Sequence, residues 1–148
     1  MDQYDKKIIA ELCKKGRMTV TELAERVGLS KTPCINRMKK LETSGHILGY
    51  TAIIDPLKQG TGHIAFVQVT LESTSSKALN RFNAAVRATP EITQCHMMAA
   101  GFDYLLKVRT RDIHDYRVIL GEKISALPHV SHTSTFVVME AVKDIGRN

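Results

Sequence analysis

The chain has 148 residues, a formal net charge of +6 and a pI near 9.3. This length suits one domain or two small ones, and the 43% hydrophobic content is ordinary for a globular protein. Excess positive charge favours an anionic partner such as nucleic acid, because bound Lys and Arg release the counterions of phosphates.

Cysteine and histidine usage argues against disulfide and metal frameworks. Cys13, Cys34 and Cys95 are odd in number and far apart, which indicates a reducing, cytoplasmic setting. Only His129 and His132 lie close together, so we expect no metal site. The N-terminal MDQYDKKII is not a signal peptide, and no apolar run approaches the roughly 18 residues that cross a bilayer, so we expect no membrane partner.

Three short helices are predicted near the N-terminus. The first has an apolar stripe from Ile8 to Cys13 and ends near Gly16. The second begins with Thr19 and Glu22, whose spacing is that of a capping box, and Gly28 closes it.

The third helix is predicted to begin at Ser30, a natural N-cap, with Pro33 in its first turn and Gly45 at its end. A capped short helix, a tight turn and a basic second helix form the pattern of a helix-turn-helix. A strand-like apolar piece over residues 47–54 follows it.

One side of the third helix supplies the candidate DNA contacts. Cys34, Met38 and Leu41 share the side expected to be buried. Asn36 suits pairing with adenine, Arg37 suits guanine or a phosphate, and the other polar residues suit phosphates. An ordinary solvated helix face is the alternative interpretation. The candidate DNA-binding residues are Ser30, Lys31, Thr32, Asn36, Arg37, Lys39 and Lys40.

Residues 55–62, DPLKQGTG, read as a linker between a DNA-binding domain over 1–54 and a second domain over 63–148. The second domain has the predicted order β-α-β-β-α-β, the ferredoxin-like arrangement, which makes the whole chain α+β. Its expected elements are a strand over 63–72, a helix over 76–88, strands over 92–99 and 104–109, a helix over 113–127 capped by Asp112, and a strand over 130–142.

The predicted strands are apolar on both faces, and this indicates a homo-oligomer. Ile64 and Phe66 point opposite to Ala65 and Val67. Because two helices cover only one face of a four-stranded sheet, we expect a second copy to cover the other. Contact with the N-terminal domain is the alternative.

No catalytic motif is recognisable in the sequence. It contains no Gly-rich phosphate loop, no serine nucleophile elbow and no paired metal ligands. Asp103 and Tyr104 follow Gly101 between two strands, and an Asp in such a connection is more often a turn residue than a catalytic one. We therefore expect no enzyme; a stand-alone metabolite-binding protein without a specific operator remains the alternative to a DNA-binding regulator.

The sequence resembles the Lrp/AsnC, or feast/famine, family of transcription regulators over nearly its whole length. The resemblance is carried by D-x-x-D-x-x-I-I from Asp2, by the segment from Gly16 to Ala52, by FNAAV from Phe82, by FDYLLKVR from Phe102, and by LGEKISALPHV followed by TFVVME. It implies a winged helix-turn-helix that binds double-stranded DNA as a dimer. Such dimers usually assemble further into tetramers, octamers or rings, and a C-terminal domain binds an amino acid between subunits.

The resemblance also implies an effector site, and no other cofactor. The family's effector-response positions fall on Met97, Asp103, Ile113, Leu127, Phe136, Val137 and Val138, with backbone groups at Ala100 and Gly101. Backbone N–H groups of the turn suit a carboxylate, Asp103 suits an ammonium group, and Met97, Leu127 and Val138 suit an apolar wall.

The turn after the second strand departs from the pattern of many relatives. They carry glycine one position earlier, where this chain has Ala100, and here Gly101 follows it. The segment MAAGFDYLLKVRTRD is similar to regulators of proline utilisation in this family, whereas the overall resemblance also allows leucine and other amino acids. The predicted effector-binding residues are Met97, Ala100, Gly101, Asp103, Leu127, Phe136 and Val138.

Overall fold

The computed structural model describes residues 1–144. The chain forms two compact units, one over Met1–Ala52 and one from Ile53 onward. Near the start of the second unit, residues 55–61 fold into a tight turn in which Thr61 N donates to Pro56 O at 2.8 Å and Gly60 adopts φ 70°.

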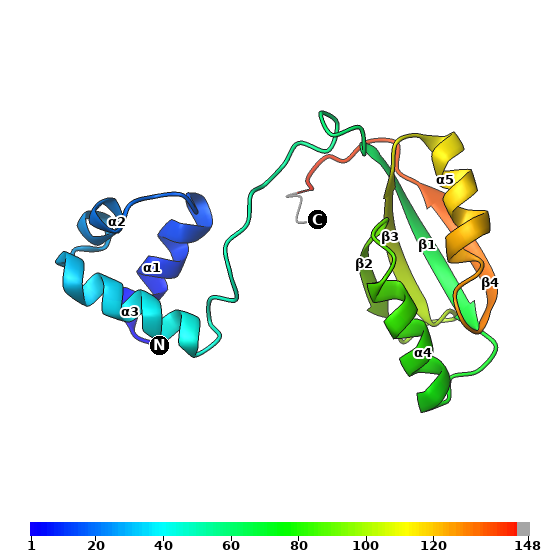
Figure 1. The fold of residues 1–148 in the computed structure, drawn as a ribbon, viewed down its shortest axis with the longest axis horizontal. Coiled ribbons are helices and arrows are strands. Elements are labelled where there is room, and N and C mark those ends of the chain that lie inside the picture. Colours follow the sequence, from blue (N-terminus) through cyan, green and yellow to red (C-terminus); the bar gives the residue numbers. More distant parts are fainter. Residues whose placement is uncertain (145–148) are drawn as a thin grey trace. The chain divides into compact units, whose positions relative to one another are not determined.

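The N-terminal unit consists of the predicted three helices, which are drawn from blue to cyan in Figure 1. Their bounds are α1 Gln3–Lys14, α2 Val20–Val27 and α3 Lys31–Thr43. Cys34 and Leu41 of α3 are buried as predicted, together with Ile8 and Leu23, whereas Met38 lies at the edge of this core. Burial of one side of α3 leaves its other side for solvent or a ligand.

The helix starts differ in part from the prediction. Thr19 caps α2, since its Oγ1 accepts from Glu22 N at 3.1 Å, but the Glu22 carboxylate pairs with Lys15 at 3.0 Å instead of reaching back. The reciprocal capping box occurs at α1, where Asp2 and Asp5 each accept the other's backbone N–H at 3.0 Å.

Helix α3 starts at the predicted N-cap, Ser30, but without a side-chain cap. An N-cap hydroxyl ordinarily accepts from the N2 or N3 backbone N–H, and Pro33 at N3 has none. The helix ends as predicted at Gly45, which adopts φ 73° while His46 N donates to Leu41 O at 2.9 Å. This is the Schellman geometry that terminates a helix.

The predicted strand over residues 47–54 is wrong. The segment is extended, but no strand of residues 1–144 pairs with it. A strand needs a ladder partner for its backbone groups, and hydrophobicity alone supplies none. Leu48 and Ile53 are therefore 96% and 68% exposed.

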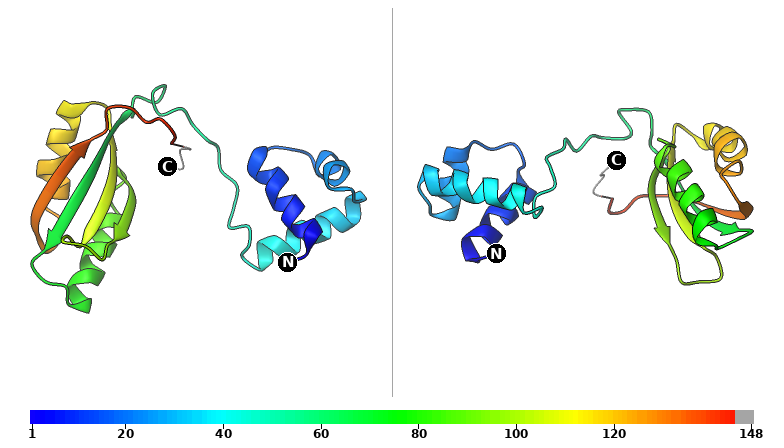
Figure 2. Two further views of the ribbon diagram at one scale, coloured as in Figure 1. Left: turned by 180° about the vertical axis from the view of Figure 1, so that it is seen from behind. Right: turned by 60° about the horizontal axis from the view of Figure 1, so that its bottom comes forward.

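The C-terminal unit is a four-stranded antiparallel sheet with two helices on one face, as Figures 1 and 2 show. The sheet order is β2-β3-β1-β4, which confirms the predicted ferredoxin-like arrangement. The elements are β1 His63–Leu71, α4 Ser76–Arg87, β2 Ile92–Met97, β3 Tyr104–Thr110, α5 Ile113–Ile119 and β4 Val130–Val137.

The core lies between the sheet and the helices. Alternate β1 residues from Ala65 to Leu71 are buried there, as the period-2 pattern predicts. The predicted helix over 113–127 is shorter, because α5 passes into a wider π-helical turn over Leu120–Ile124. Ile113 is 56% exposed, so the apolar stripe of that helix starts at Tyr116.

The final strand ends at Val137, five residues before the predicted end at Val142. The chain then crosses the outer face of the sheet, where the Asp144 carboxylate accepts from Lys107 at 2.5 Å and Arg109 at 2.7 Å. Both cations are buried, and a buried cation needs such a partner. The hydrogen bond from Lys107 holds the pKa of Asp144 below its ordinary value.

Candidate DNA-binding face and effector-binding region

The outward side of α3 carries a group of exposed polar residues. Asn36 lies opposite the Cys34 and Leu41 anchors, because a residue two positions along a helix is turned by about 200°. Thr32, Lys39 and Lys40 flank Asn36 on this side, and all are exposed. Ser30 and Lys31 stand at the N-terminal end of the same helix. Six of the seven predicted DNA contacts thus lie on one end and one side of α3.

Arg37 is the seventh, and it faces α1 instead. Its Nη1 donates to Asp2 Oδ2 at 2.5 Å and to Asp5 Oδ1 at 2.8 Å. Its guanidinium also lies 5.4 Å from the centroid of the Tyr4 ring, in cation–π geometry. The Arg37 side chain is 30% exposed. Sequence spacing could not reveal this, because the three partners belong to another helix.

The predicted effector turn follows β2 and is fastened to β1 by Asp103. Asp103 Oδ2 accepts from Leu71 N at 2.7 Å, and Asp103 N donates to Val69 O at 2.9 Å. Ala100 and Gly101 are exposed at the tip of this turn. Asp103 therefore has a structural partner as well as a predicted ligand.

The other predicted effector residues lie apart within a single chain. Leu127 is buried in the core at 7% exposure. Phe136 lies on the outer face opposite Phe66 and is 54% exposed, and Val138 N donates to Ile64 O beside it. One copy of the chain does not bring these residues and the Ala100–Gly101 turn around one cavity.

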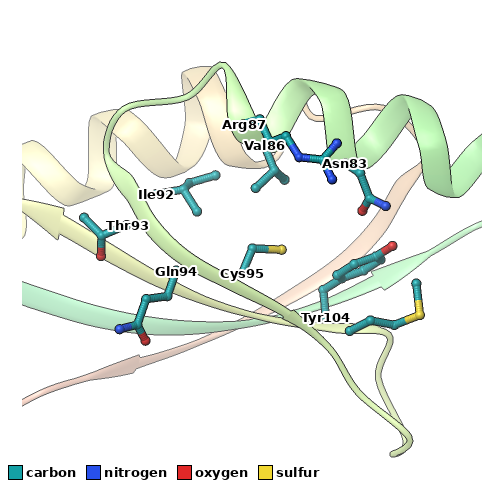
Figure 3. Close-up of a pocket in the computed structure, with 9 residues that line it drawn as sticks. Asn83, Val86, Arg87, Ile92, Thr93, Gln94, Cys95 and Tyr104 are labelled. Atoms are coloured by element: carbon teal, nitrogen blue, oxygen red, sulfur yellow. The ribbon is translucent and has the colours of Figure 1, made fainter. Parts of the chain in front are cut away.

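Met97 alone among the predicted residues borders a cavity between α4 and the sheet, shown in Figure 3. Its volume is about 400 Å³. Helix α4 contributes Asn83, Val86 and Arg87, and the strands contribute Ile92, Cys95, Met97 and Tyr104. Burial raises the pKa of the Cys95 thiol and of the Tyr104 phenol, so both are neutral near pH 7. Sequence reasoning assigned no site role to Asn83, Arg87 or Cys95, although Asn83 lies in the FNAAV segment that carries the family resemblance.

Residues 1–144 contain no group of three or more His, Cys, Asp or Glu side chains arranged to hold a metal ion. None of the helices in this part of the chain is long and apolar enough to cross a membrane.

A helix-turn-helix with an exposed basic side, joined to an α/β domain with a cavity, defines a DNA-binding regulator with a separate sensing domain. Two family models match the chain accordingly. Residues 1–47 match a winged helix-turn-helix DNA-binding domain, and residues 64–147 match the Lrp/AsnC ligand binding domain. The chain belongs to the Lrp/AsnC family.

Individual relatives agree with this assignment over almost their whole length. A proline dehydrogenase transcriptional activator of Rhizobium radiobacter is 57% identical, covering 99% of this chain and 94% of its own. The leucine-responsive regulatory protein of Salmonella typhimurium is 45% identical, covering 99% and 90%. A Neisseria meningitidis transcriptional regulator solved with L-Met superposes with a TM-score of 0.91 at 31% identity, covering 97% and 93%. These proteins are regulators, and the chain is a regulator and not an enzyme, as the sequence predicts.

Proposed function

We propose that this protein is a cytoplasmic transcription regulator of amino-acid metabolism. It binds operator DNA through α3 and changes that binding when an amino acid occupies its C-terminal domain. The observation that carries the proposal is the exposed side of α3 with Asn36, Lys39 and Lys40, held outward by the buried Cys34 and Leu41.

The DNA contacts divide by chemistry. Asn36 lies at the centre of the outward side and suits a bidentate contact to adenine in the major groove. Lys39 and Lys40 suit phosphates, as do Lys31, Thr32 and the uncapped Ser30 hydroxyl at the helix start. Asn36 is therefore proposed to contribute specificity and the lysines to contribute affinity.

A salt titration of DNA binding tests this division. An operator is first selected from random duplexes with the full-length protein. Replacing both Lys39 and Lys40 by Gln should flatten the slope of log K against log salt by roughly 2 for each protomer that contacts the operator, since each phosphate contact contributes about 0.9. Lys77→Gln on the exposed start of α4 is the matched control and should leave the slope unchanged. An unaltered slope in the double variant would refute the assignment of α3.

The amino-acid effector is proposed from the relatives and from the Asp103 turn. The matched relatives are a proline dehydrogenase activator and leucine-responsive proteins, and one solved relative holds L-Met. We propose control of amino-acid catabolism, with genes of proline degradation as the first targets to examine. A thermal-shift screen of the twenty amino acids identifies the effector, because a ligand of the native state raises its stability.

The functional unit is proposed to be a homo-oligomer built on a dimer. Phe136 is exposed on the outer face of the sheet, and the predicted effector residues do not meet within one chain. A second copy placed on that face would cover Phe136 and complete the site. The alternative, a stand-alone amino-acid-binding protein, predicts effector binding without any protected operator in a footprint.

A further inference from the structure

Tyr104 carries a polar group that the fold buries and leaves without a partner. The residue is 2% exposed, and its ring packs against Phe82 with centroids 4.4 Å apart. By distance and angle no atom of residues 1–144 forms a hydrogen bond with its hydroxyl, although the Asn83 side chain lies near enough to lower its pKa against the larger effect of burial. Figure 3 shows the hydroxyl directed toward Asn83, at the end of the cavity between α4 and the sheet. A buried hydroxyl without a partner costs free energy, which a bound acceptor would recover.

The described residues that line the same cavity include one cation and no carboxylate. The cation is Arg87. Arg87 forms no ion pair within residues 1–144. Val86 and Ile92 give the cavity an apolar wall, and about 400 Å³ lies in the range of small-molecule sites.

We propose that this cavity binds a small 2-oxo acid with an aliphatic side chain. The Arg87 guanidinium pairs with the ligand's carboxylate, and the Tyr104 hydroxyl donates to the 2-oxo oxygen. The aliphatic side chain of the ligand lies along Val86 and Ile92. An amino acid of the same skeleton fits less well, because its ammonium group would take the place of the 2-oxo oxygen at Tyr104, where no carboxylate among the described lining residues balances its charge. The proposed site uses Arg87 and Tyr104 and not the Asp103 carboxylate of the proposed amino-acid site, and Met97 borders both.

Calorimetric titration of the full-length protein with 4-methyl-2-oxopentanoate and with leucine tests the proposal on a matched pair of ligands. The 2-oxo acid should bind with Kd at or below about 1 mM, and Arg87→Gln and Tyr104→Phe should each weaken it about tenfold or more. Neither variant should change any binding of leucine. Asp103→Asn, in turn, should leave binding of the 2-oxo acid unchanged.

Tyr104→Phe also provides a control for folding. Removal of an unpartnered hydroxyl should leave the melting temperature of the ligand-free protein unchanged or raised. No binding of the 2-oxo acid up to about 10 mM, or unchanged binding in both variants, would overturn the proposal. Neither result would touch the DNA-binding or amino-acid proposals, which rest on α3 and on the Asp103 turn.

An independent observation concerns Arg37, whose partners make it a poor candidate for reading bases. Asp5 is only 5% exposed, and Arg37 is the cation that pairs with it. Loss of Arg37 would leave a largely buried carboxylate without its charge partner, which is costly. The same guanidinium bonds to Asp2, so it fastens α3 to the capped start of α1.

We infer that Arg37 is a positioning residue, which supports DNA binding by fixing the direction of α3. The alternative is direct contact with DNA. The two roles of Arg37 predict opposite effects of neutralising Asp5 on DNA binding. If Arg37 contacts DNA, neutralising the nearby Asp5 removes a repulsive charge and strengthens binding. If Arg37 positions α3, Asp5→Asn loosens the helix and weakens binding.

Mobility-shift titrations with Arg37→Met, Arg37→Lys and Asp5→Asn separate these cases. Arg37→Met and Asp5→Asn should each weaken binding about five- to thirtyfold with an unchanged salt slope. Arg37→Lys should recover part of the loss by restoring one ion pair. Circular dichroism at the assay temperature confirms that each variant is folded. A flatter slope in Arg37→Met, or equal or tighter binding by Asp5→Asn, would overturn the inference.

Discussion

Replacement of Asp103 tests one role that the structure shows for its carboxylate and one that is proposed for it. Asp103 Oδ2 holds the backbone N–H of Leu71 at 2.7 Å, at the end of β1. The same side chain is the predicted acceptor for the ammonium group of an amino-acid effector. Asp103→Ala removes both, whereas Asp103→Asn keeps an oxygen acceptor for Leu71 N and removes only the charge.

The structural part of this change is the loss of the hydrogen bond between Asp103 and Leu71 N. A hydrogen bond to a charged group contributes about 1.5–3 kcal/mol, and Asp103 is half-buried, so about 2 kcal/mol is expected for Asp103→Ala. For a domain of this size, 2 kcal/mol lowers the melting temperature by roughly 8–16 °C. Asp103→Asn should lose about half as much, because a neutral hydrogen bond is roughly half as strong as a charged one.

Differential scanning calorimetry measures the stability, and mobility shifts well below both melting temperatures measure the effector response. We expect both variants to bind operator DNA as the wild type does, and both to lose the response. If Asp103→Ala melts like the wild type, the hydrogen bond to Leu71 does not contribute to stability. A normal response in Asp103→Asn would refute the role of the charge in binding the ammonium group.

Three further changes test other parts of the structure. Asp144→Asn should destabilise the C-terminal domain by about 1–3 kcal/mol in urea unfolding, since it leaves Lys107 and Arg109 poorly paired, and an unchanged midpoint would contradict this ion pair. The pKa of Asp144 is lowered in the folded state, so its contribution to stability is present above the ordinary pKa of 3.8 and is lost as the pH falls below that value. In an acid titration, the wild type should therefore lose stability relative to Asp144→Asn. Gly45→Ala should destabilise the protein by about 1–2 kcal/mol, because an L side chain is strained at φ 73°. Gly121→Ala is the control, since Gly121 lies in a helical turn with open space around it and should tolerate a side chain. Equal stability of the two variants would contradict the αL geometry of Gly45. Phe136→Arg should reduce the mass in sedimentation equilibrium, and an unchanged mass would place the oligomer contact elsewhere.

Local patterns predicted the elements well, because the information for them lies within a few residues. The spacing of Cys34 and Leu41 identified the buried side of α3, and Gly45 identified its end. The alternation in β1 identified the face that packs on the helices. The prediction of a strand over residues 47–54 failed because a strand also needs a neighbouring strand. The segment has the hydrophobicity of a strand, but no partner strand exists among the described residues.

Contacts between distant residues were beyond the same reasoning. Arg37 is predicted to contact guanine or a phosphate, and sequence spacing gives no sign of its two carboxylate partners at the start of α1. Lys107 and Arg109 alternate on β3, and their common partner Asp144 lies more than thirty residues away in the sequence, so only the fold brings the three together. The ion-pair partner of a charged side chain depends on which distant segment packs against it. The spacing of residues along the sequence does not reveal that segment.

The double use of Asp103 also makes a prediction about how the effector binds. Oδ2 is occupied by Leu71 N, whereas no hydrogen bond within residues 1–144 uses Oδ1. An ammonium group can therefore approach Oδ1 without breaking the bond that fastens the turn to β1. Hydrogen exchange of the Leu71 amide, measured with and without the amino acid, should show equal or greater protection in the complex. Faster exchange on binding would mean that the ligand pulls the carboxylate away from β1, and the turn would then be a moving part of the response instead of a fixed platform for it.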